Sequence, residues 1–437
     1  MCFRKLFSSM SGTDRSHTEE DLDNSHSDND DHGDGASVDP IDTETENTSI
    51  PKEDKPVEEK AIPNPMCEVA YCYSLEEVIG QEEVVSVATS DDNSDLYFDA
   101  SAVAIKGTAL TSRNYWMEIE LPAKVVRLKC YINDNPRLLW KDIPSDQSVK
   151  PDKDYQALLS PGLDMIAVSH RGRLHANQGT NRDDDFFLGR AGKFALSIVA
   201  DGAGSAPLSS TGSKVFCKEA GARFVELVDA KYDELLKEIV VSLQSPADDL
   251  STNMRLLSVL YDILPAAALF GRQALMKMAA DKQVPLKHYH TTALLSMSAQ
   301  VDDSVWFCAA FQIGDGITVA LTDQHLELLG KGDSGNFPGE TVFVTSNGVF
   351  DDSKSLLGRI HCCFCKQMPT LISMTDGITD SYFKNVRLDD VSRWQQLRTD
   401  ISDDKGRLKP ADVICDWLNY YIEQEHDDRT MTVVMYK

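Results

Sequence analysis

Residues 194–207 read Phe194-Ala-Leu-Ser-Ile-Val-Ala200 followed by Asp201-Gly202-Ala-Gly-Ser-Ala-Pro207. The continuous apolar run predicts a strand buried on both faces, and the Asp-Gly dipeptide predicts the turn that ends it. A carboxylate at the end of a buried strand is held rigidly, and hard oxygen ligands suit Mg²⁺ or Mn²⁺. Asp-Gly is also a very common turn dipeptide, so this stretch alone does not separate a metal site from an ordinary turn.

The same pattern of acidic residues beside a strand recurs in the second half of the chain. Asp376-Gly377 directly follows the run Leu371–Thr375, and Asp427-Asp428 directly precedes Thr430–Val434. Upstream, Asp183-Asp184-Asp185 precedes the strand region that leads to Asp201. Several such clusters in one region favour a site built from convergent carboxylates.

The apolar patterning around these clusters predicts an α+β fold. Strands are expected at Thr291–Ala299, Val305–Gln312, Ile317–Thr322, Thr341–Thr345, Thr370–Thr375 and Met431–Tyr436. Helical spacing covers Gly212–Leu243, Met254–Ala280 with a break or kink at Pro265, and Ala411–Glu423. Strands and helices do not alternate as βαβ units would, so we expect antiparallel sheets packed together with helices outside.

Composition divides the 437-residue chain into three parts. Residues 1–66 are expected to form a disordered acidic tail, because residues 11–60 hold 17 Asp and Glu against 4 Lys and Arg. Residues 67–165 are expected to form a β-rich accessory region and a linker, with strands at Phe98–Ile105, Tyr115–Leu121 and Val125–Ile132 and the linker at 141–162. Residues 166–437 hold the acidic clusters and form the third part.

Charge and hydropathy exclude several kinds of partner. A net charge of −27 opposes binding to a phosphate backbone, so we expect no nucleic-acid partner. We find no stretch apolar for long enough to span a bilayer, and expect no membrane association. The chain is therefore expected to be a cytoplasmic protein, acting as a monomer.

The 10 cysteines are scattered without a repeating frame, which favours reduced thiols over a disulfide scaffold. One cluster stands out, at His361-Cys362-Cys363-Phe364-Cys365. Structural zinc usually needs two separated ligand pairs, and Cys67 and Cys72 could supply a second one. The spacing favours ordinary free thiols in a loop. The surrounding region, residues 346–369, is either a flap over the site or an insertion.

Four segments together resemble the type 2C (PPM-type) metal-dependent serine/threonine protein phosphatases, in their bacterial-like branch. Val199–Ala206 is similar to the first Asp-Gly signature of that family and Phe311–Gly316 to its internal Gly-Asp turn. Met374–Asp380 is similar to the second Asp-Gly motif, and His426–Thr430 to the closing motif. The resemblance covers about residues 166–437. It implies an αββα sandwich of two antiparallel sheets flanked by helices, with two Mg or Mn ions at one end.

The resemblance also implies roles for individual residues. Asp201 would bridge two metal ions, the Gly202 carbonyl would bind one of them, and Asp376 and Asp427 would hold the other. Segment 169–185 resembles the opening motif, with His175 as the catalytic or phosphate-binding group, Asp183 as a metal ligand and Asp184 as its catalytic acidic neighbour. Arg171, Arg173 and Arg182 are rival phosphate binders.

The function implied is hydrolysis of phosphoserine and phosphothreonine in a phosphoprotein substrate, by a water bridging two ions. Two alternatives remain. A pseudophosphatase would keep the sandwich as a binding or regulatory module without activity. A non-enzymatic interaction protein would act through the acidic tail and the β-rich region.

Overall fold

The computed structural model describes residues 55–437, except 81, 91–94, 247–248, 331 and 333–340. The predicted disordered tail therefore lies largely outside the described residues. The chain divides between Leu139 and Trp140 into two compact units, each described here by itself.

The N-terminal unit contains two small sheets around its own core. A four-stranded sheet has the order β1-β7-β6-β3, and a three-stranded sheet has the order β2-β5-β4. The strands are β1 (Val57–Ala61), β2 (Tyr71–Ser74), β3 (Ser86–Thr89), β4 (Leu96–Asp99), β5 (Ala104–Gly107), β6 (Arg113–Glu120) and β7 (Val125–Ile132), with short helices α1 (Glu76–Ile79) and α2 (Pro136–Leu139). The predicted strand Phe98–Ile105 is instead the hairpin between β4 and β5.

Strand β1 lies inside the segment predicted to be disordered, and this part of the prediction is wrong. It pairs in parallel with β7, although its side chains are exposed. Glu58 forms an ion pair with Lys124 at 2.7 Å, and Glu59 forms one with Lys129 at 2.7 Å. The acidic residues that looked like a solvated tail are held by backbone pairing and by basic residues on or just before the neighbouring strand.

Two antiparallel sheets form the centre of the C-terminal unit. The five-stranded sheet has the order β10-β11-β12-β13-β16, and the six-stranded sheet has the order β15-β14-β17-β18-β9-β8. The first contains β10 (Asp185–Ala191), β11 (Phe194–Ala200), β12 (Ala293–Asp302), β13 (Val305–Ile313) and β16 (Ile360–Cys365). The second contains β8 (Lys153–Ser160), β9 (Leu163–His170), β14 (Ile317–Leu321), β15 (Leu326–Leu328), β17 (Thr370–Met374) and β18 (Arg429–Tyr436).

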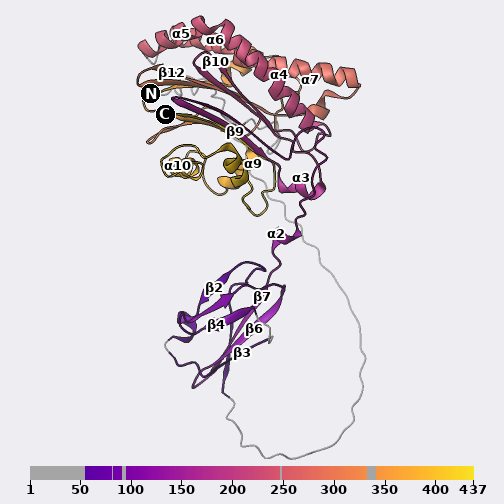
Figure 1. Cartoon of the computed structure of the whole chain (residues 1–437), viewed down its shortest axis with the longest axis vertical. Helices are drawn as coiled ribbons and strands as arrows, with labels where there is room; N and C mark the ends of the chain where they lie inside the picture. Colours follow the sequence, from indigo (N-terminus) through magenta and orange to yellow (C-terminus); the bar gives the residue numbers. More distant parts are fainter. Residues whose placement is uncertain (1–54, 81, 91–94, 247–248, 331, 333–340) are drawn as a thin grey trace, which may run out of the picture. The chain divides into compact units, whose positions relative to one another are not determined.

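Helices cover the outer faces of both sheets, as Figure 1 shows for this unit. The five-stranded sheet is covered by α4 (Ser209–Ala230), α5 (Tyr232–Gln244), α6 (Leu250–Tyr261), α7 (Leu264–Lys282) and α8 (Ser353–Gly358). The six-stranded sheet is covered by α9 (Asp376–Tyr382), α10 (Val391–Asp400) and α11 (Ala411–Trp417). The short elements α3 (Arg173–Gln178) and η2 (Leu286–Tyr289) lie in connections. The predicted αββα sandwich is confirmed.

Buried side chains between the two sheets include apolar residues and hydroxyl groups. Alternate residues of β18 point to opposite faces, so that Val433 packs against the helices and Val434 between the sheets. Ser296 lies within hydrogen-bond distance of Ser197 at 2.7 Å and of Ser373 at 3.1 Å, so it links strands of both sheets. These hydroxyl groups are satisfied by one another, which removes the cost of burying them.

The strand registers place the acidic clusters at one end of the sandwich. Asp185 opposes Ala200 across β10 and β11, so Asp183 and Asp184 lie beside Asp201. Met374 opposes Met431 across β17 and β18, so the residues just after β17 and just before β18 lie beside one another.

Several connections differ from the sequence predictions. The predicted linker at 141–162 contains β8, which pairs with β9 along its whole length, so the sandwich begins before residue 166. Residues 346–369 contain α8 and the edge strand β16, and so form part of the sandwich rather than a flap or an insertion. Around Thr341 the described residues form an isolated bridge instead of a strand, and α11 ends at Trp417 rather than Glu423.

The segment Leu250–Lys282 has the length and composition of a membrane-spanning helix, with a mean hydropathy of 1.4, although the sequence analysis found no such stretch. In the structure it is two helices, with Pro265 in the first turn of α7 as the predicted break. Within the apolar window 56% is buried inside the protein, where residues such as Leu256 and Leu264 pack in the core beneath the helices. Core packing accounts for this apolar composition.

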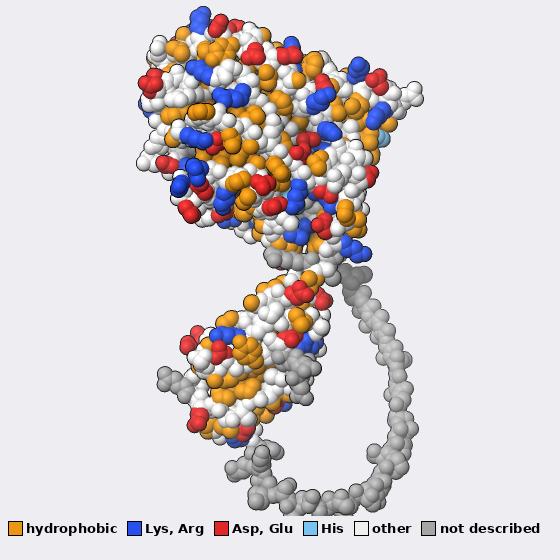
Figure 2. All heavy atoms as spheres, viewed as in Figure 1, with side chains coloured by type: hydrophobic (Ala, Val, Ile, Leu, Met, Phe, Trp, Pro, Cys, Tyr) orange, Lys and Arg blue, Asp and Glu red, His pale blue; other side chains and the backbone are white. Residues whose placement is uncertain are grey.

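Charged side chains are mixed on the visible face of the protein. In Figure 2, Lys and Arg side chains alternate with Asp and Glu and do not gather into a continuous basic field.

Candidate metal centre

Carboxylates from separate segments converge at the end of the sandwich. Asp201, Asp315 and Asp376 each offer an oxygen, and these oxygens lie within 4.8 Å of one another. A second group consists of a ring nitrogen of His175 and carboxylate oxygens of Asp427 and Asp428, again within 4.8 Å of one another. These side chains come from the connections after β11 and β13, from the first residue of α9 shortly after β17, from α3 and from the segment before β18.

The carboxylates disfavour one another's ionisation. Burial raises the pKa of Asp201 well above its usual value, and the charges of Asp184, Asp376 and Asp427 raise it further. Burial also raises the pKa of Asp376 to about 7, with contributions from Asp315 and Asp427. Like charges at this spacing are costly without a cation, so the arrangement is hard to explain as core packing alone.

Asp428 organises the backbone beneath this centre. Its carboxylate accepts a hydrogen bond from the Gly172 N–H at 2.5 Å and one from the Asp183 N–H. The imidazole Nε2 of His175 lies 3.5 Å from an oxygen of Asp183 and 3.8 Å from an oxygen of Asp428. His175 is oriented through its Nδ1, which lies 2.8 Å from Oγ1 of Thr180. The structure thus brings His175 and Asp183 of the predicted opening motif together with Asp428 of the predicted closing motif.

Asp184 is buried below the metal-facing residues and is bound to the neighbouring sheet. It is 1% exposed and accepts a hydrogen bond from Thr375 Oγ1 at 2.8 Å. Burial, Asp428 and Asp427 raise its pKa well above the usual value. Thr375 immediately precedes Asp376, so this hydrogen bond connects the acidic pair Asp183-Asp184 to the Asp376-Gly377 dipeptide.

Lys150 supports the same acidic pair from the interior. Its side chain is 2% exposed, and its Nζ lies 3.2 Å from a carboxylate oxygen of Asp185. The same ammonium donates to the carbonyl oxygens of Asp183 at 3.3 Å and Asp184 at 2.8 Å, and to Ser213 Oγ at 2.8 Å. It therefore fixes the backbone that carries the pair.

Two glycines allow backbones to meet at the centre. A Cβ on Gly377 would lie 1.9 Å from the carbonyl oxygen of Asp428. A Cβ on Gly202 would lie 2.7 Å from the carbonyl oxygen of Asp183. Any larger residue would push these segments apart, which explains the glycine in each Asp-Gly pair.

The candidate phosphate-binding arginines occupy three different environments. Arg171 is 6% exposed and engages Asp142 at 3.1 Å, Asp152 at 3.3 Å and the Ile143 carbonyl at 2.9 Å. Arg182 is fully buried. Arg173 lines a small pocket that also includes Arg171 and Asp427. Its guanidinium donates to Asn419 at 3.2 Å and lies 5.4 Å from the ring centroid of Tyr421. Of the three, Arg173 alone is partly exposed, so it is the one that an anion at the acidic centre can reach from solvent.

The donor set fits Mg²⁺ or Mn²⁺. It consists of carboxylate oxygens, as hard divalent cations prefer, and the buried Oδ1 of Asp376 has no hydrogen-bond partner among the described residues. Uncompensated carboxylates and a buried acceptor without a donor are both explained by a cation at this position.

The family model for protein phosphatase 2C matches residues 171–418, more than half of the chain. The chain belongs to the protein phosphatase 2C family. This membership confirms the predicted resemblance, and with it the predicted dependence on Mg²⁺ or Mn²⁺. The match begins inside the opening motif and includes both Asp-Gly dipeptides.

Solved structures similar to this protein phosphatase 2C chain are distant in sequence. RsbX in complex with magnesium is 13% identical, with 65% of this chain and 100% of that chain covered and a TM-score of 0.33. The catalytic domain of the serine threonine protein phosphatase PstP with two manganese ions is 16% identical, with coverages of 63% and 98% and a TM-score of 0.38. A phosphatase from Toxoplasma gondii is 11% identical, with coverages of 65% and 95% and a TM-score of 0.39. No curated protein matches the chain.

Sequence reasoning assigned no role to three residues that the structure places at the site. Asp315 lies in the Gly-Asp turn quoted for the resemblance, and the position of that turn after a buried strand was the available signal. Asp428 was identified with the closing motif, but its backbone contacts depend on chain segments about 250 residues apart. Lys150 lies in the segment predicted to be a linker, where nothing in the sequence pattern marked it.

The metal-free protein should lose stability as the pH rises. Burial raises the pKa values of Asp183 and Asp376 to about 7 from an ordinary 3.8. Between these values the folded chain holds more protons than the unfolded chain, so the free energy of unfolding falls as the pH rises from about 4 to about 7. Calorimetry in EDTA should show this fall, and Asp376→Asn should reduce it. An unchanged pH dependence in that variant would contradict the assignment.

Proposed function

We propose that this chain is a metal-dependent protein serine/threonine phosphatase that hydrolyses phosphoserine and phosphothreonine with a water bridging two Mg²⁺ or Mn²⁺ ions. The observation that supports the proposal most strongly is the convergence of Asp201, Asp315 and Asp376 on one position, next to His175, Asp427 and Asp428. Family membership supports the same reaction class.

The residues that the resemblance assigned as metal ligands keep that role in this proposal. Asp201, Asp376, Asp427 and Asp183, with the Gly202 carbonyl, would hold the ions. Bound divalent ions lower the pKa of a coordinated water so that hydroxide is present near neutral pH. The protein itself provides carboxylates that the ends of buried strands hold in place, and Asp201 and Asp376 remain partly exposed to solvent.

His175 and Arg173 would act on the substrate. With its Nδ1 bound to Thr180, His175 presents Nε2 to the acidic centre and can hold a proton for the leaving alkoxide. Arg173 would orient the phosphate through its guanidinium, which suits a phosphate geometrically. Arg171 and Arg182 would have structural roles, since one is bound to the segment before β8 and the other is buried.

Activity should depend completely on divalent metal. Purified full-length protein treated with EDTA should not hydrolyse a phosphoserine or phosphothreonine peptide, and added Mn²⁺ or Mg²⁺ should restore turnover. A phosphotyrosine peptide of the same sequence is the control for substrate class. Full activity in excess EDTA would refute the two-metal mechanism. Metal binding to folded protein without any hydrolysis would favour the inactive binding or regulatory module instead.

A further inference from the structure

Three cysteines form a cluster between the sheets. Cys308 lies on β13, and Cys363 and Cys365 lie on β16 at alternate positions, which places them on the same face of the strand. Cys308 and Cys363 oppose each other directly in the antiparallel register. The sequence analysis placed Cys363 and Cys365 in a loop and did not associate Cys308 with them.

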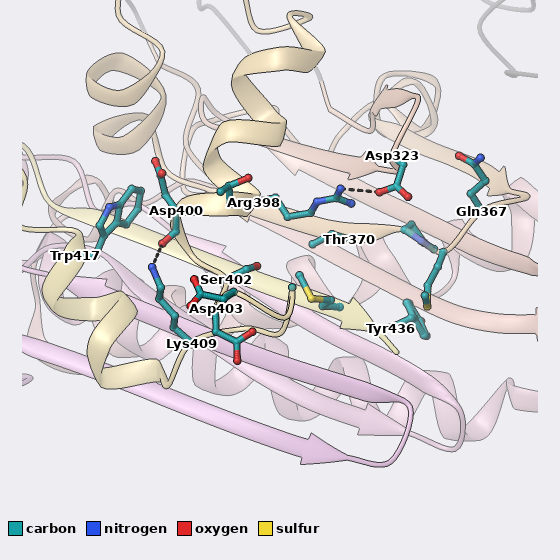
Figure 3. Close-up of a pocket in the computed structure, with 16 residues that line it drawn as sticks. Asp323, Gln367, Thr370, Arg398, Asp400, Ser402, Asp403, Lys409, Trp417 and Tyr436 are labelled. Carbon is teal, nitrogen blue, oxygen red and sulfur yellow. Dashed lines mark hydrogen bonds and ion pairs between the residues drawn. The ribbon is translucent and has the colours of Figure 1, made fainter.

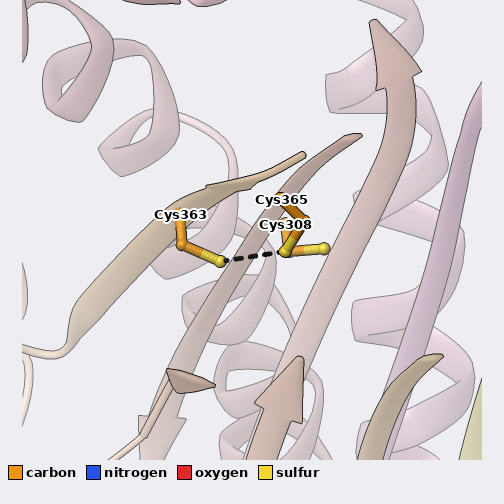
Figure 4. A group of neighbouring side chains, drawn as sticks. All are labelled: Cys308, Cys363 and Cys365. Atoms are coloured by element: carbon orange, nitrogen blue, oxygen red, sulfur yellow. Dashed lines mark hydrogen bonds between the residues drawn. The ribbon is translucent and has the colours of Figure 1, made fainter. Parts of the chain in front are cut away.

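The three sulfur atoms lie as close as ligands of one ion. All three Sγ atoms lie within 4.8 Å of one another, and those of Cys363 and Cys365 are 3.9 Å apart. Figure 4 shows the Cys363 side chain directed toward those of Cys308 and Cys365, which overlap in this view. Thiolates bound to one ion at a metal–sulfur distance of about 2.3 Å in a plane are separated by about 4 Å, so little movement is required.

The cluster is buried and lies away from the acidic centre. Cys308, Cys363 and Cys365 are 0%, 4% and 7% exposed, in the apolar layer between the sheets. On β13 the chain runs from Trp306, beside Cys365 in the register, to Ile313 at the acidic end. At about 3.3 Å per residue, Cys308 lies roughly 16 Å from that end, so the two sites do not share ligands.

A surface groove shares one residue, Tyr436, with the buried cluster that contains the three cysteines. The groove has a volume of about 1260 Å³, and its lining includes Gln367, Thr370 and Tyr436. Figure 3 shows these residues together with the Arg398–Asp323 ion pair, which also lines the groove. Tyr436 packs in the same buried cluster as Cys308, Cys363 and Cys365. The cysteines themselves are not among the residues that line the groove.

We propose that Cys308, Cys363 and Cys365 form a binding site for one thiophilic metal ion, such as Zn²⁺ or Cu⁺. Soft thiolate ligands select these ions over Mg²⁺ and Mn²⁺, so the site is chemically distinct from the acidic centre. Each bond to the metal replaces a thiol proton, which passes to solvent. The ion would join the edge strand β16 to β13 and so stabilise that edge of the five-stranded sheet.

The three thiols differ in how readily they ionise. Hydrogen bonds from Cys308 and Cys363 lower the pKa of Cys365. Contacts within the cluster and burial raise the pKa values of Cys308 and Cys363 well above the ordinary value, so an ion would have to displace both of their protons. Free cysteines in a core otherwise behave as small apolar side chains that pack without binding anything. A metal titration separates the two possibilities.

The test is a titration of full-length reduced protein with Cd²⁺, a thiophilic probe, in excess Mg²⁺ that keeps hard-ligand sites occupied. We expect one equivalent to bind with ultraviolet absorption from sulfur-to-metal charge transfer, and the melting temperature to rise. Cys365→Ser should weaken binding by more than about 100-fold, since loss of even an outer-shell partner costs 10–100-fold. Zn²⁺ and Cu⁺ should compete for the same equivalent.

Cys362→Ser is the matched control, because Cys362 is buried on the same strand but faces the helices. This variant should retain the absorption band and the stoichiometry. If Cys365→Ser does not fold, Cys363→Ala replaces it in the titration and should weaken binding in the same way. Three results would overturn the proposal. The first is absence of the band in wild-type protein, and the second is a band retained in both Cys365→Ser and Cys363→Ala. The third is a Cys308–Cys363 disulfide in freshly purified protein that prevents binding.

Discussion

Asp201→Asn should reduce the turnover of a phosphoserine peptide by about three orders of magnitude while the protein remains folded. The carboxylate of Asp201 lies among Asp184, Asp376 and Asp427, and its loss removes an anionic ligand from the centre of the group. Metal ions supply several kcal/mol of transition-state stabilisation, and each 1.36 kcal/mol corresponds to a tenfold change in rate. Steady-state kinetics at saturating Mn²⁺ measures the effect.

Folding provides the internal control for this variant. Because neighbouring carboxylates raise the pKa of Asp201, removing its charge relieves repulsion. In EDTA at pH 8 the melting temperature of Asp201→Asn should equal or exceed that of wild type. Asp302→Asn is the matched control, since Asp302 ends β12 at the far end of the sandwich and is exposed. Turnover of Asp201→Asn within about twofold of wild type would contradict the proposed centre.

The strands that lead to the two Asp-Gly dipeptides were predictable because local sequence determines them. An apolar run followed by Asp-Gly predicts a buried strand and the turn that ends it, and Asp201 lies in the connection directly after β11. After β17 the strand is as predicted, but Asp376 and Gly377 are the first residues of α9 rather than a turn. Asp315 follows an equally clear strand, but a single Gly-Asp turn carries little information alone. What sequence could not supply was the strand register, which decides that these acidic residues lie at the same end.

Residues that act through the backbone of distant segments left no sequence signal. The sequence predicts Lys150 to be an ordinary exposed charged residue in a segment with several prolines, yet its side chain is almost fully buried. Arg182 reads as a phosphate binder but is fully buried. Long cationic side chains are usually exposed, so burial of either one depends on partners that only the fold brings together.

Strands were missed where their partners, rather than their own composition, stabilise them. Segment 57–61 carries three charged residues and forms β1 through pairing with β7. Strand β8 alternates weakly and is largely exposed, but it pairs with all of β9. Strand β16 was obscured by its cysteines, which are apolar enough to occupy both faces of an edge strand.

Lys150→Met should lower the free energy of unfolding by about 3–5 kcal/mol, the usual cost of removing one partner of a buried ion pair. The change leaves the carboxylate of Asp185 without its 3.2 Å partner and removes donors from the carbonyls of Asp183 and Asp184. Denaturant unfolding measures the effect. Lys214→Met is the matched control, because Lys214 is exposed and donates to the neighbouring Val149 carbonyl. It should lose less than about 1 kcal/mol.

A double variant separates the two functions of Lys150. Asp185→Asn removes the buried charge, so Lys150→Met with Asp185→Asn should recover part of the stability lost in the single variant. The carbonyls of Asp183 and Asp184 remain without the ammonium, and their backbone carries the acidic pair of the metal centre. The double variant should therefore still require more Mn²⁺ for half-maximal activity than wild type, by about 10–100-fold. If stability and Mn²⁺ requirement both return to wild-type values, Lys150 neutralises Asp185 and does not position the metal-binding backbone.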